Sequence, residues 1–272
     1  MTPQYQRYYE YYAQRCPTCK GSKRVLKNGS WVSCYCQKVA SYKCRFDQIR
    51  VHPASLKQKG WDDFTGLITD NNITTGMLDP SAAIEGKKKA LAYCYKNGDY
   101  SKKENLKIHK HLGDGQNVII GGGKRSGKTM LGYLIMKEVM RSALYNNLKI
   151  TFDWVHVAEL KQAARWDNNK PLDHSTLDDL AEVDFLAIDG VDYETREGHH
   201  TNPPDRTSMN MLFAQRDMYR KPTIIICTDS FINMLCPRYE QSIALQWGDE
   251  FCNLVNQSSN LVIHLKRGRK SE

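Results

Sequence analysis

A glycine-rich stretch near the middle of the chain has the residue types that bind a nucleotide phosphate. Residues 122–129 read GGKRSGKT and fit the pattern G-x-x-x-x-G-K-[ST], between an apolar run and a helical one. The glycines let several backbone N–H groups point at one phosphate group, and the following helix adds its positive N-terminal end. Lys128 is expected to reach the β- and γ-phosphates, and Thr129 to bind Mg²⁺. The predicted ATP loop consists of Gly122, Gly123, Lys124, Arg125, Ser126, Gly127, Lys128 and Thr129.

A second stretch, DFLAIDG at residues 184–190, places an acid at the end of an apolar run. A buried parallel strand delivers a carboxylate to a nucleotide-bound Mg²⁺ in this way, so Asp189 is the expected metal-holding acid. ATPases of this kind usually have a second acid next, which prepares water for attack, but here Gly190 follows. Asp192 is the alternative catalytic acid if the chain turns at Gly190. ATP binding is therefore predicted and hydrolysis is left open, because a lost general base removes about 10² to 10⁴ in rate.

A third stretch, KPTIIICTD at residues 221–229, reads as one more buried strand. In additional-strand P-loop ATPases such a strand lies between the strand before the phosphate loop and the strand before the metal-holding acid. Its polar tip, Thr228 and Asp229, is then the expected sensor of the γ-phosphate. Small-molecule P-loop kinases, the alternative class, usually lack this strand and carry an arginine-rich lid.

Near the start of the chain, two close pairs of cysteines are separated by fourteen residues. The insert has its own turn signal, Asn28-Gly29, which would fold one pair over the other. Four thiolates would complete a tetrahedral zinc site with no position open for water, so the site would be structural. Cys44 is the alternative fourth ligand, and free thiols in a flexible arm are the alternative to a metal site. The predicted zinc ligands are Cys16, Cys19, Cys34 and Cys36.

The elements that position these groups follow an alternating pattern. From Asn117 onward, short β-rich runs alternate with amphipathic helical segments, which predicts an α/β fold with a parallel sheet flanked by helices. The predicted domains are a cysteine-rich zinc-binding head at 1–50, a helical connector at 51–110 and the nucleotide-binding core at 111–272.

The composition bears on partners and location. The formal net charge of +9 favours polyanions, with residues 87–89 and 266–270 as candidate phosphate contacts and solvated charge as the alternative for each. Neither a run of about 18 apolar residues nor the apolar segment of a secretory signal is present, so cytoplasmic residence is expected. Four tyrosines near the N-terminus could stack on bases or on a partner protein: Tyr8, Tyr9, Tyr11 and Tyr12.

In their order along the chain, these features resemble the DnaC/DnaI-like replicative helicase loaders of bacteria and phages. A C-x-x-C…C-x-C head comes first, then a proline-to-aromatic stretch from Pro53 to Phe64, the phosphate loop, and R-x₅-P-T-I-I-I from Arg216 to Ile226. The chain is also similar to the IstB-type ATPase helpers of insertion-sequence transposases. Those helpers usually lack the cysteine head, so the head favours the loaders.

The resemblance implies an AAA+ core that binds ATP between subunits and assembles as a homo-oligomer on single-stranded DNA. The implied partner is the hexameric replicative DNA helicase, which such proteins help to place on DNA during replication initiation in a bacterial cell or phage-infected host. Carried onto this sequence, Lys128, Thr129 and Asp189 form the nucleotide site.

The resemblance also implies an arginine that reaches a neighbouring subunit's nucleotide. Arg216 occupies one such position, and Arg238 is the nearest candidate for the arginine finger, a fixed cation that stabilises charge on the γ-phosphoryl group. The sequence departs from the family in Gly190, in a Thr-Asp sensor tip without asparagine, and in lacking arginine between Arg238 and Lys266. The alternative functions are an ATP-dependent DNA-targeting helper of a transposase and a non-hydrolysing ATP-gated adaptor.

Overall fold

The computed structural model describes residues 3–48, 54–64, 80–164, 174–191, 203–233 and 247–266. Its centre is a five-stranded sheet in the order β4-β5-β6-β3-β7, with every neighbouring pair parallel. The strand predicted within residues 221–229 is β6, and it lies between β3, which precedes the phosphate loop, and β5, which carries Asp189, as expected. This order and the flanking helices confirm the predicted AAA+ type of α/β core. The strands are β3 (Val118–Gly122), β4 (Phe152–His156), β5 (Phe185–Val191), β6 (Thr223–Thr228) and β7 (Leu261–Leu265).

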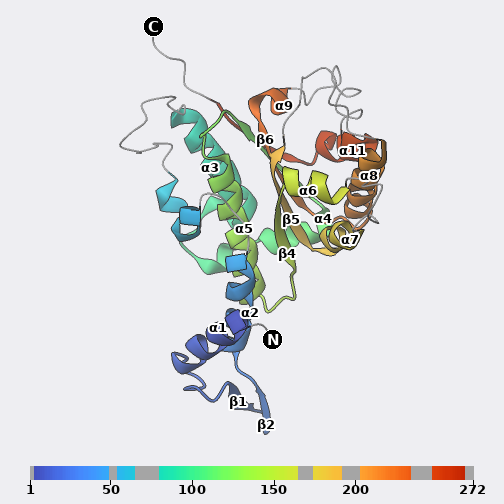
Figure 1. Ribbon diagram of the computed structural model, residues 1–272. Coiled ribbons are helices and arrows are strands. Elements are labelled where there is room, and N and C mark those ends of the chain that lie inside the picture. The colour runs from blue at the N-terminus through green and yellow to red at the C-terminus, as the bar shows by residue number, and fades with distance from the viewer. Residues whose placement is uncertain are drawn as a thin grey trace.

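Helices cover both faces of this sheet (Figure 1). Consecutive residues of β3 belong to different clusters of buried side chains, because Val118 and Ile120 pack with α3 and α5 whereas Ile119 packs with the opposite layer. Strands that are buried on both faces must be almost wholly apolar, which the five buried residues of β3 illustrate. The helices are α3 (Pro80–Cys94), α4 (His111–Asp114), α5 (Lys128–Tyr145), α6 (Val157–Ala164), α7 (His174–Glu182), α8 (Pro203–Met218), α9 (Asp229–Asn233) and α11 (Asp249–Asn256). None of the described helices has the length and apolar composition needed to cross a membrane.

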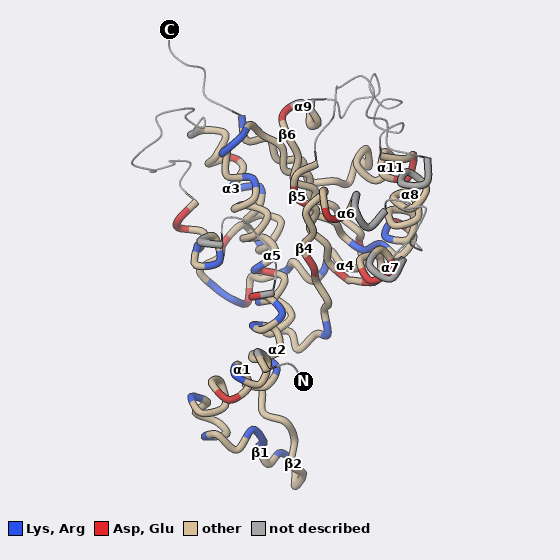
Figure 2. The backbone as a smooth tube through the Cα atoms, in the orientation of Figure 1, with Lys and Arg blue, Asp and Glu red and all other residues tan. Residues whose placement is uncertain are grey.

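The cysteine-rich head projects from one end of the core (Figure 1). It contains α1 (Pro3–Gln14), the antiparallel hairpin of β1 (Arg24–Lys27) and β2 (Ser30–Ser33), and the start of α2 (Tyr35–Gln48). The predicted turn is present, since Asn28 and Gly29 have φ values of 50° and 78°, as a type I′ turn requires. Lysine and arginine residues occur in both the hairpin and α3 (Figure 2).

The second half of α2 belongs to the core. Tyr42 and Phe46 are buried in the same cluster as Phe152, and the Tyr42 hydroxyl donates to the Leu148 carbonyl at 2.7 Å and accepts from the Ile150 N–H at 3.1 Å. Head and core are therefore joined through one helix, and the domain limits of 1–50, 51–110 and 111–272 remain predictions.

The connector is held on α5 by a buried carboxylate. Glu138 accepts hydrogen bonds from Trp61 Nε1 at 2.9 Å, from the Tyr95 hydroxyl at 2.5 Å and from Arg141 at 3.0 Å. Three donors compensate the desolvation of this buried charge. Around α3 the described part of the connector consists of short 3₁₀ turns: Ala54–Gln58, Trp61–Asp63, Lys96–Gly98, Lys103–Asn105 and Ile108–Lys110.

Arg216 requires a correction, because it lies inside the fold and not at a subunit surface. Its side chain in α8 is fully buried, and the guanidinium donates to the Thr223 hydroxyl at 2.9 Å and to four backbone carbonyls. Burial lowers the pKa of Arg216 to about 9. A buried guanidinium with these partners cannot reach a neighbour's nucleotide, so Arg216 stabilises the fold of its own subunit. The four carbonyls are those of Leu180, Val183, Lys221 and Pro222.

Replacement of Arg216 by alanine is expected to destabilise the core by about 3 kcal/mol, because it leaves several buried carbonyls without donors. Urea unfolding followed by circular dichroism measures this, with Lys89→Ala on the exposed side of α3 as the control. An Arg216→Ala variant as stable as the control would contradict the structural role.

Candidate functional site

The phosphate loop leaves β3 at Gly122 and enters α5 at Lys128. Two of its glycines cannot be replaced without displacing neighbours. A Cβ on Gly122 would lie 2.6 Å from the Leu265 carbonyl oxygen, and one on Gly127, where φ is 85°, would lie 3.0 Å from the Phe64 ring. The backbone therefore approaches β7 and the connector as closely as only glycine permits.

Lys128 lies back over this loop. Its ammonium donates to the carbonyls of Gly122 and Gly123, both at 2.6 Å. Lys124 and Arg125 are exposed at the loop tip, whereas Ser126 is buried beneath it. The loop thus presents backbone N–H groups and a fixed cation at the N-terminus of an 18-residue helix, an arrangement that fits a nucleotide phosphate.

Asp189 and Thr129 meet at the carboxyl edge of the sheet. The Thr129 side chain and, more weakly, the positive charge of Lys128 favour the ionised form of the Asp189 carboxylate. Burial nevertheless dominates and raises the pKa of Asp189 above its usual value. A partly buried carboxylate beside a threonine hydroxyl fits Mg²⁺, whose charge would offset this desolvation and whose preferred ligands are oxygens.

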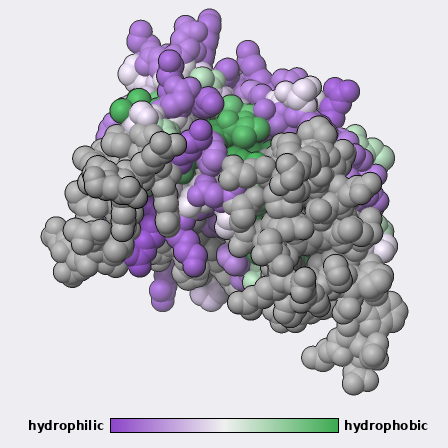
Figure 3. Space-filling view, turned by 90° about the horizontal axis from the view of Figure 1, so that it is seen from above, coloured by the Kyte–Doolittle hydropathy of each residue, from purple (hydrophilic) through white to green (hydrophobic). Residues whose placement is uncertain are grey.

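The predicted sensor residues lie at the same edge. Thr228 ends β6 and pairs in register with Gly122, so it adjoins the phosphate loop. Asp229 begins α9, and its Oδ1 lies 2.8 Å from Nε2 of His264 in β7. Seen from above, the described surface on the side of α9 is largely hydrophilic around one hydrophobic area (Figure 3). The structure thus brings Lys128, Thr129, Asp189 and the Thr228 backbone to one edge.

Gly190 occupies a position that has no room for a side chain. Its φ is 85°, the pairing of β5 with β6 shifts register between Asp189 and Val191, and a Cβ would lie 2.6 Å from Nε2 of His156. An acid in the usual place would have to displace that imidazole and strain the backbone. Asp192 and Arg238, the predicted displaced acid and arginine finger, lie outside the described residues.

Sequence reasoning missed His156, although a signal for it was present. ITFDWVH at residues 150–156 is another β-rich run that ends on a polar residue, as the runs before Asp189 and Thr228 do. The carboxyl ends of parallel strands share one edge of a sheet, and His156 is the register partner of Asp189.

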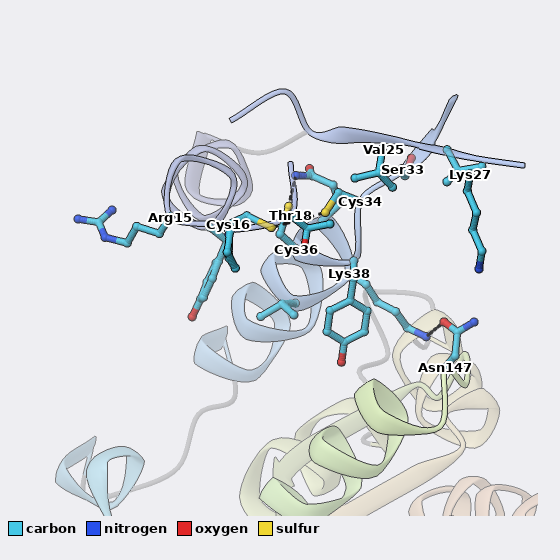
Figure 4. A pocket seen from close by; sticks show the side chains of 16 residues that line it. Arg15, Cys16, Thr18, Val25, Lys27, Ser33, Cys34, Cys36, Lys38 and Asn147 are labelled. Atoms are coloured by element: carbon cyan, nitrogen blue, oxygen red, sulfur yellow. Dashed lines mark hydrogen bonds between the residues drawn. The ribbon is translucent and has the colours of Figure 1, made fainter. Parts of the chain in front are cut away.

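The four predicted zinc ligands converge in the head. Their Sγ atoms all lie within 4.8 Å of one another, and the Cys16–Cys34 and Cys19–Cys36 separations are both 3.6 Å. Tetrahedral Zn–S bonds of about 2.3 Å require sulfur separations of about 3.8 Å, so the cluster could hold one zinc ion. Three of them, Cys16, Cys34 and Cys36, line a pocket of about 730 Å³ whose lining also includes Arg15 and Lys38 (Figure 4).

The pKa values of the clustered thiols differ, and a bound cation would bring them all to the same charge state. Hydrogen bonding from the Cys19 backbone lowers the pKa of the Cys16 thiol to about 6, whereas burial raises that of Cys36 to about 12. A bound divalent cation would favour the thiolate form in all four. Cys44, the alternative ligand, is buried in α2 and is not part of the cluster.

The comparisons with known proteins give structural matches alone. No family model matches the chain, and no curated protein matches its sequence. The DnaC helicase loader is similar over 72% of this chain and 95% of its own, with 16% identity and a TM-score of 0.43. DnaI is similar over 79% and 94%, with 14% identity and a TM-score of 0.47. The replication initiator DnaA bound to AMPPCP and single-stranded DNA is similar over 79% and 51%, with 17% identity and a TM-score of 0.44.

These neighbours include the proteins that the sequence resembles, DnaC and DnaI. At these scores the likeness adds nothing about activity, so the functional assignment depends on the residues of this chain.

The protein is expected to contain one zinc ion per chain, and Cys36→Ser is expected to lose it because three thiolates leave the tetrahedral site open. Metal analysis of the purified variants measures this, and Cys44→Ser is the matched control that keeps its zinc. Zinc lost from Cys44→Ser and retained by Cys36→Ser would reverse the ligand assignment.

Proposed function

We propose that this protein is an ATP-binding helicase loader that contacts single-stranded DNA and the hexameric replicative helicase and helps to place that helicase on DNA. The observation that carries the nucleotide part is the meeting of Lys128, Thr129 and Asp189 across β6. The loader part is supported by the order of the cysteine head, connector, phosphate loop and R-x₅-P-T-I-I-I stretch.

In this proposal each group of the site has one task. Loop N–H groups and Lys128 hold the β- and γ-phosphates of ATP. Thr129 and Asp189 would hold Mg²⁺, which neutralises phosphate charge when bound. Thr228 at the end of β6 and Asp229 at the start of α9 would respond to the γ-phosphate. Arg238 of a neighbouring subunit is the proposed arginine finger in a homo-oligomer formed on ATP and DNA.

Hydrolysis is proposed to be slow. Gly190 supplies no carboxylate, and the geometry around it excludes one. A loader needs ATP chiefly to favour one assembly state over another, and slow turnover suffices to reset it. The same observation favours the second candidate function, a non-hydrolysing ATP-gated adaptor. A DNA-targeting helper of a transposase is the remaining alternative, and copurification with an integrase-like protein would support it.

The hairpin of the head is the proposed contact for single-stranded DNA. Its cross-strand neighbours Leu26 and Trp31 are 62% and 66% exposed, an arrangement that offers an aromatic face for stacking. The chain has no acid between Glu10 and Asp47, so phosphates would meet only cations there. These cations are Arg15, Lys20, Lys23, Arg24, Lys27, Lys38, Lys43 and Arg45.

ATP binding is expected to depend on Lys128. Lys128→Ala should weaken MgATP binding about 100-fold, because it removes a charge-assisted contact to the phosphates. Isothermal titration calorimetry measures the affinity, and Lys102→Ala, on an exposed turn, is the control. Equal affinity in parent and Lys128→Ala would remove the basis of the nucleotide assignment.

DNA binding is expected to depend on Trp31. Trp31→Ala should weaken binding of a deoxythymidine oligonucleotide about tenfold, which corresponds to the loss of one stacked base. Fluorescence anisotropy of the labelled oligonucleotide measures this, with Met218→Ala, an exposed apolar side chain on α8, as control. Unchanged DNA affinity together with lost helicase binding would instead assign the hairpin to the helicase.

A deletion of residues 1–50 is unsuitable for this purpose, because it would remove Tyr42 and Phe46 from the core. Point variants on the exposed hairpin leave that packing intact.

A further inference from the structure

His156 lies where the missing acid would otherwise act. It ends β4, beside the strand that delivers Asp189, and is the register partner of that residue. Its Nε2 occupies the space into which a side chain at position 190 would project, 2.6 Å from an ideal Cβ there. The absence of a side chain at Gly190 therefore makes room for the His156 imidazole.

The hydrogen bonding of the ring determines what Nε2 can do. The Ala158 backbone N–H donates to Nδ1 at 3.2 Å, so the neutral imidazole carries its hydrogen on Nε2. The ring is thus oriented from behind by the start of α6, and an N–H donor faces Gly190. The His156 residue remains exposed at this edge, where water has access.

We infer that His156 positions the water that attacks ATP, in place of the acid that this site lacks. This inference rests on the proposed function, since it needs MgATP in the phosphate loop. Phosphoryl transfer passes through a loose transition state, so positioning of water contributes much of the catalysis even without a strong base. A hydrogen bond from Nε2–H to one lone pair of the water would leave its other lone pair to face phosphorus.

The step balances without a further reactant. The water oxygen forms a bond to the γ-phosphorus, and the bond from that phosphorus to the β–γ bridging oxygen breaks. ADP leaves with the electron pair of the broken bond, and the protons of the water pass to the released phosphate and to solvent. His156 holds the water and exchanges no proton in this step, so it gives slower turnover than a carboxylate that accepts a proton from the water.

The experiment measures steady-state ATP turnover by the full chain, with and without a deoxythymidine oligonucleotide. His156→Ala should lower kcat about tenfold or more while KM for ATP changes less than about twofold, because a residue that contacts only the attacking water contributes to the transition state. His156→Gln, which keeps a side-chain N–H donor, should retain more of the turnover than His156→Ala. His109→Ala, remote from Asp189, is the matched control, and thermal unfolding checks that each variant is folded.

Gly190→Ala provides a second variant at the same place. Its Cβ should displace the imidazole and lower kcat at least as much as His156→Ala does, because an alanine at a φ of 85° also strains the backbone beside Asp189.

Unchanged kcat in His156→Ala would overturn the inference, and loss of turnover in Asp192→Ala alone would give the role to Asp192. A parent that binds MgATP without turning it over would also overturn it, yet would leave ATP binding and the loader proposal standing. Absence of MgATP binding by the parent would refute the inference and the proposed function together.

Discussion

The approach of the Thr129 side chain to the Asp189 carboxylate is the interaction on which the nucleotide site depends. The two residues belong to elements on either side of β6, and neighbouring strands are about 4.8 Å apart, so α5 must approach the sheet closely for their side chains to meet. Gly132 permits that approach, because a Cβ there would lie 2.6 Å from the Ile226 side chain. The metal site therefore depends on the strand order, on the close packing of α5 against the sheet and on the presence of both Thr129 and Asp189.

The connector is part of this arrangement. Trp61 and Tyr95 donate to the buried Glu138 of α5, and the Phe64 ring lies against Gly127 of the phosphate loop. The helix that carries Lys128 and Thr129 is thus held from its outer side as well as by the sheet. Through Tyr42 and Phe46, α2 packs in the same cluster and joins the head to this layer. The second half of α2 and the helix that carries the nucleotide site therefore pack in one cluster, whereas the cysteines of the head belong to a separate one.

The sequence predicts the parts of this site that depend on local chemistry. The glycine pattern places the phosphate loop, the apolar run before Asp189 places the metal-holding acid, and the Asn28-Gly29 pair places the hairpin turn that brings the cysteines together. The length and composition of the run KPTIIICTD predict a buried parallel strand, whereas its place between β3 and β5 is predicted from the strand order of additional-strand P-loop ATPases.

What the sequence does not predict depends on contacts between distant residues. The sequence does not distinguish a buried arginine such as Arg216 from one on the surface. Only the packing of α8 shows that the Arg216 guanidinium donates its hydrogen bonds to backbone carbonyls. The residues next to Gly190 in the sequence likewise do not explain why this position is a glycine. The imidazole that leaves no room for a side chain there belongs to His156 of β4, 34 positions earlier in the chain. Comparison with the usual motif shows that an acid is missing at position 190, whereas the structure shows that the His156 imidazole fills that space.

The most direct test of the account is the Mg²⁺ dependence of ATP binding, measured by calorimetry for the parent and for Asp189→Asn. If Thr129 and Asp189 form the metal site, Mg²⁺ should tighten ATP binding to the parent about tenfold or more and have little effect on the variant. An equal effect of Mg²⁺ on both proteins would contradict the assignment of Asp189, and with it the site built around the Thr129–Asp189 contact.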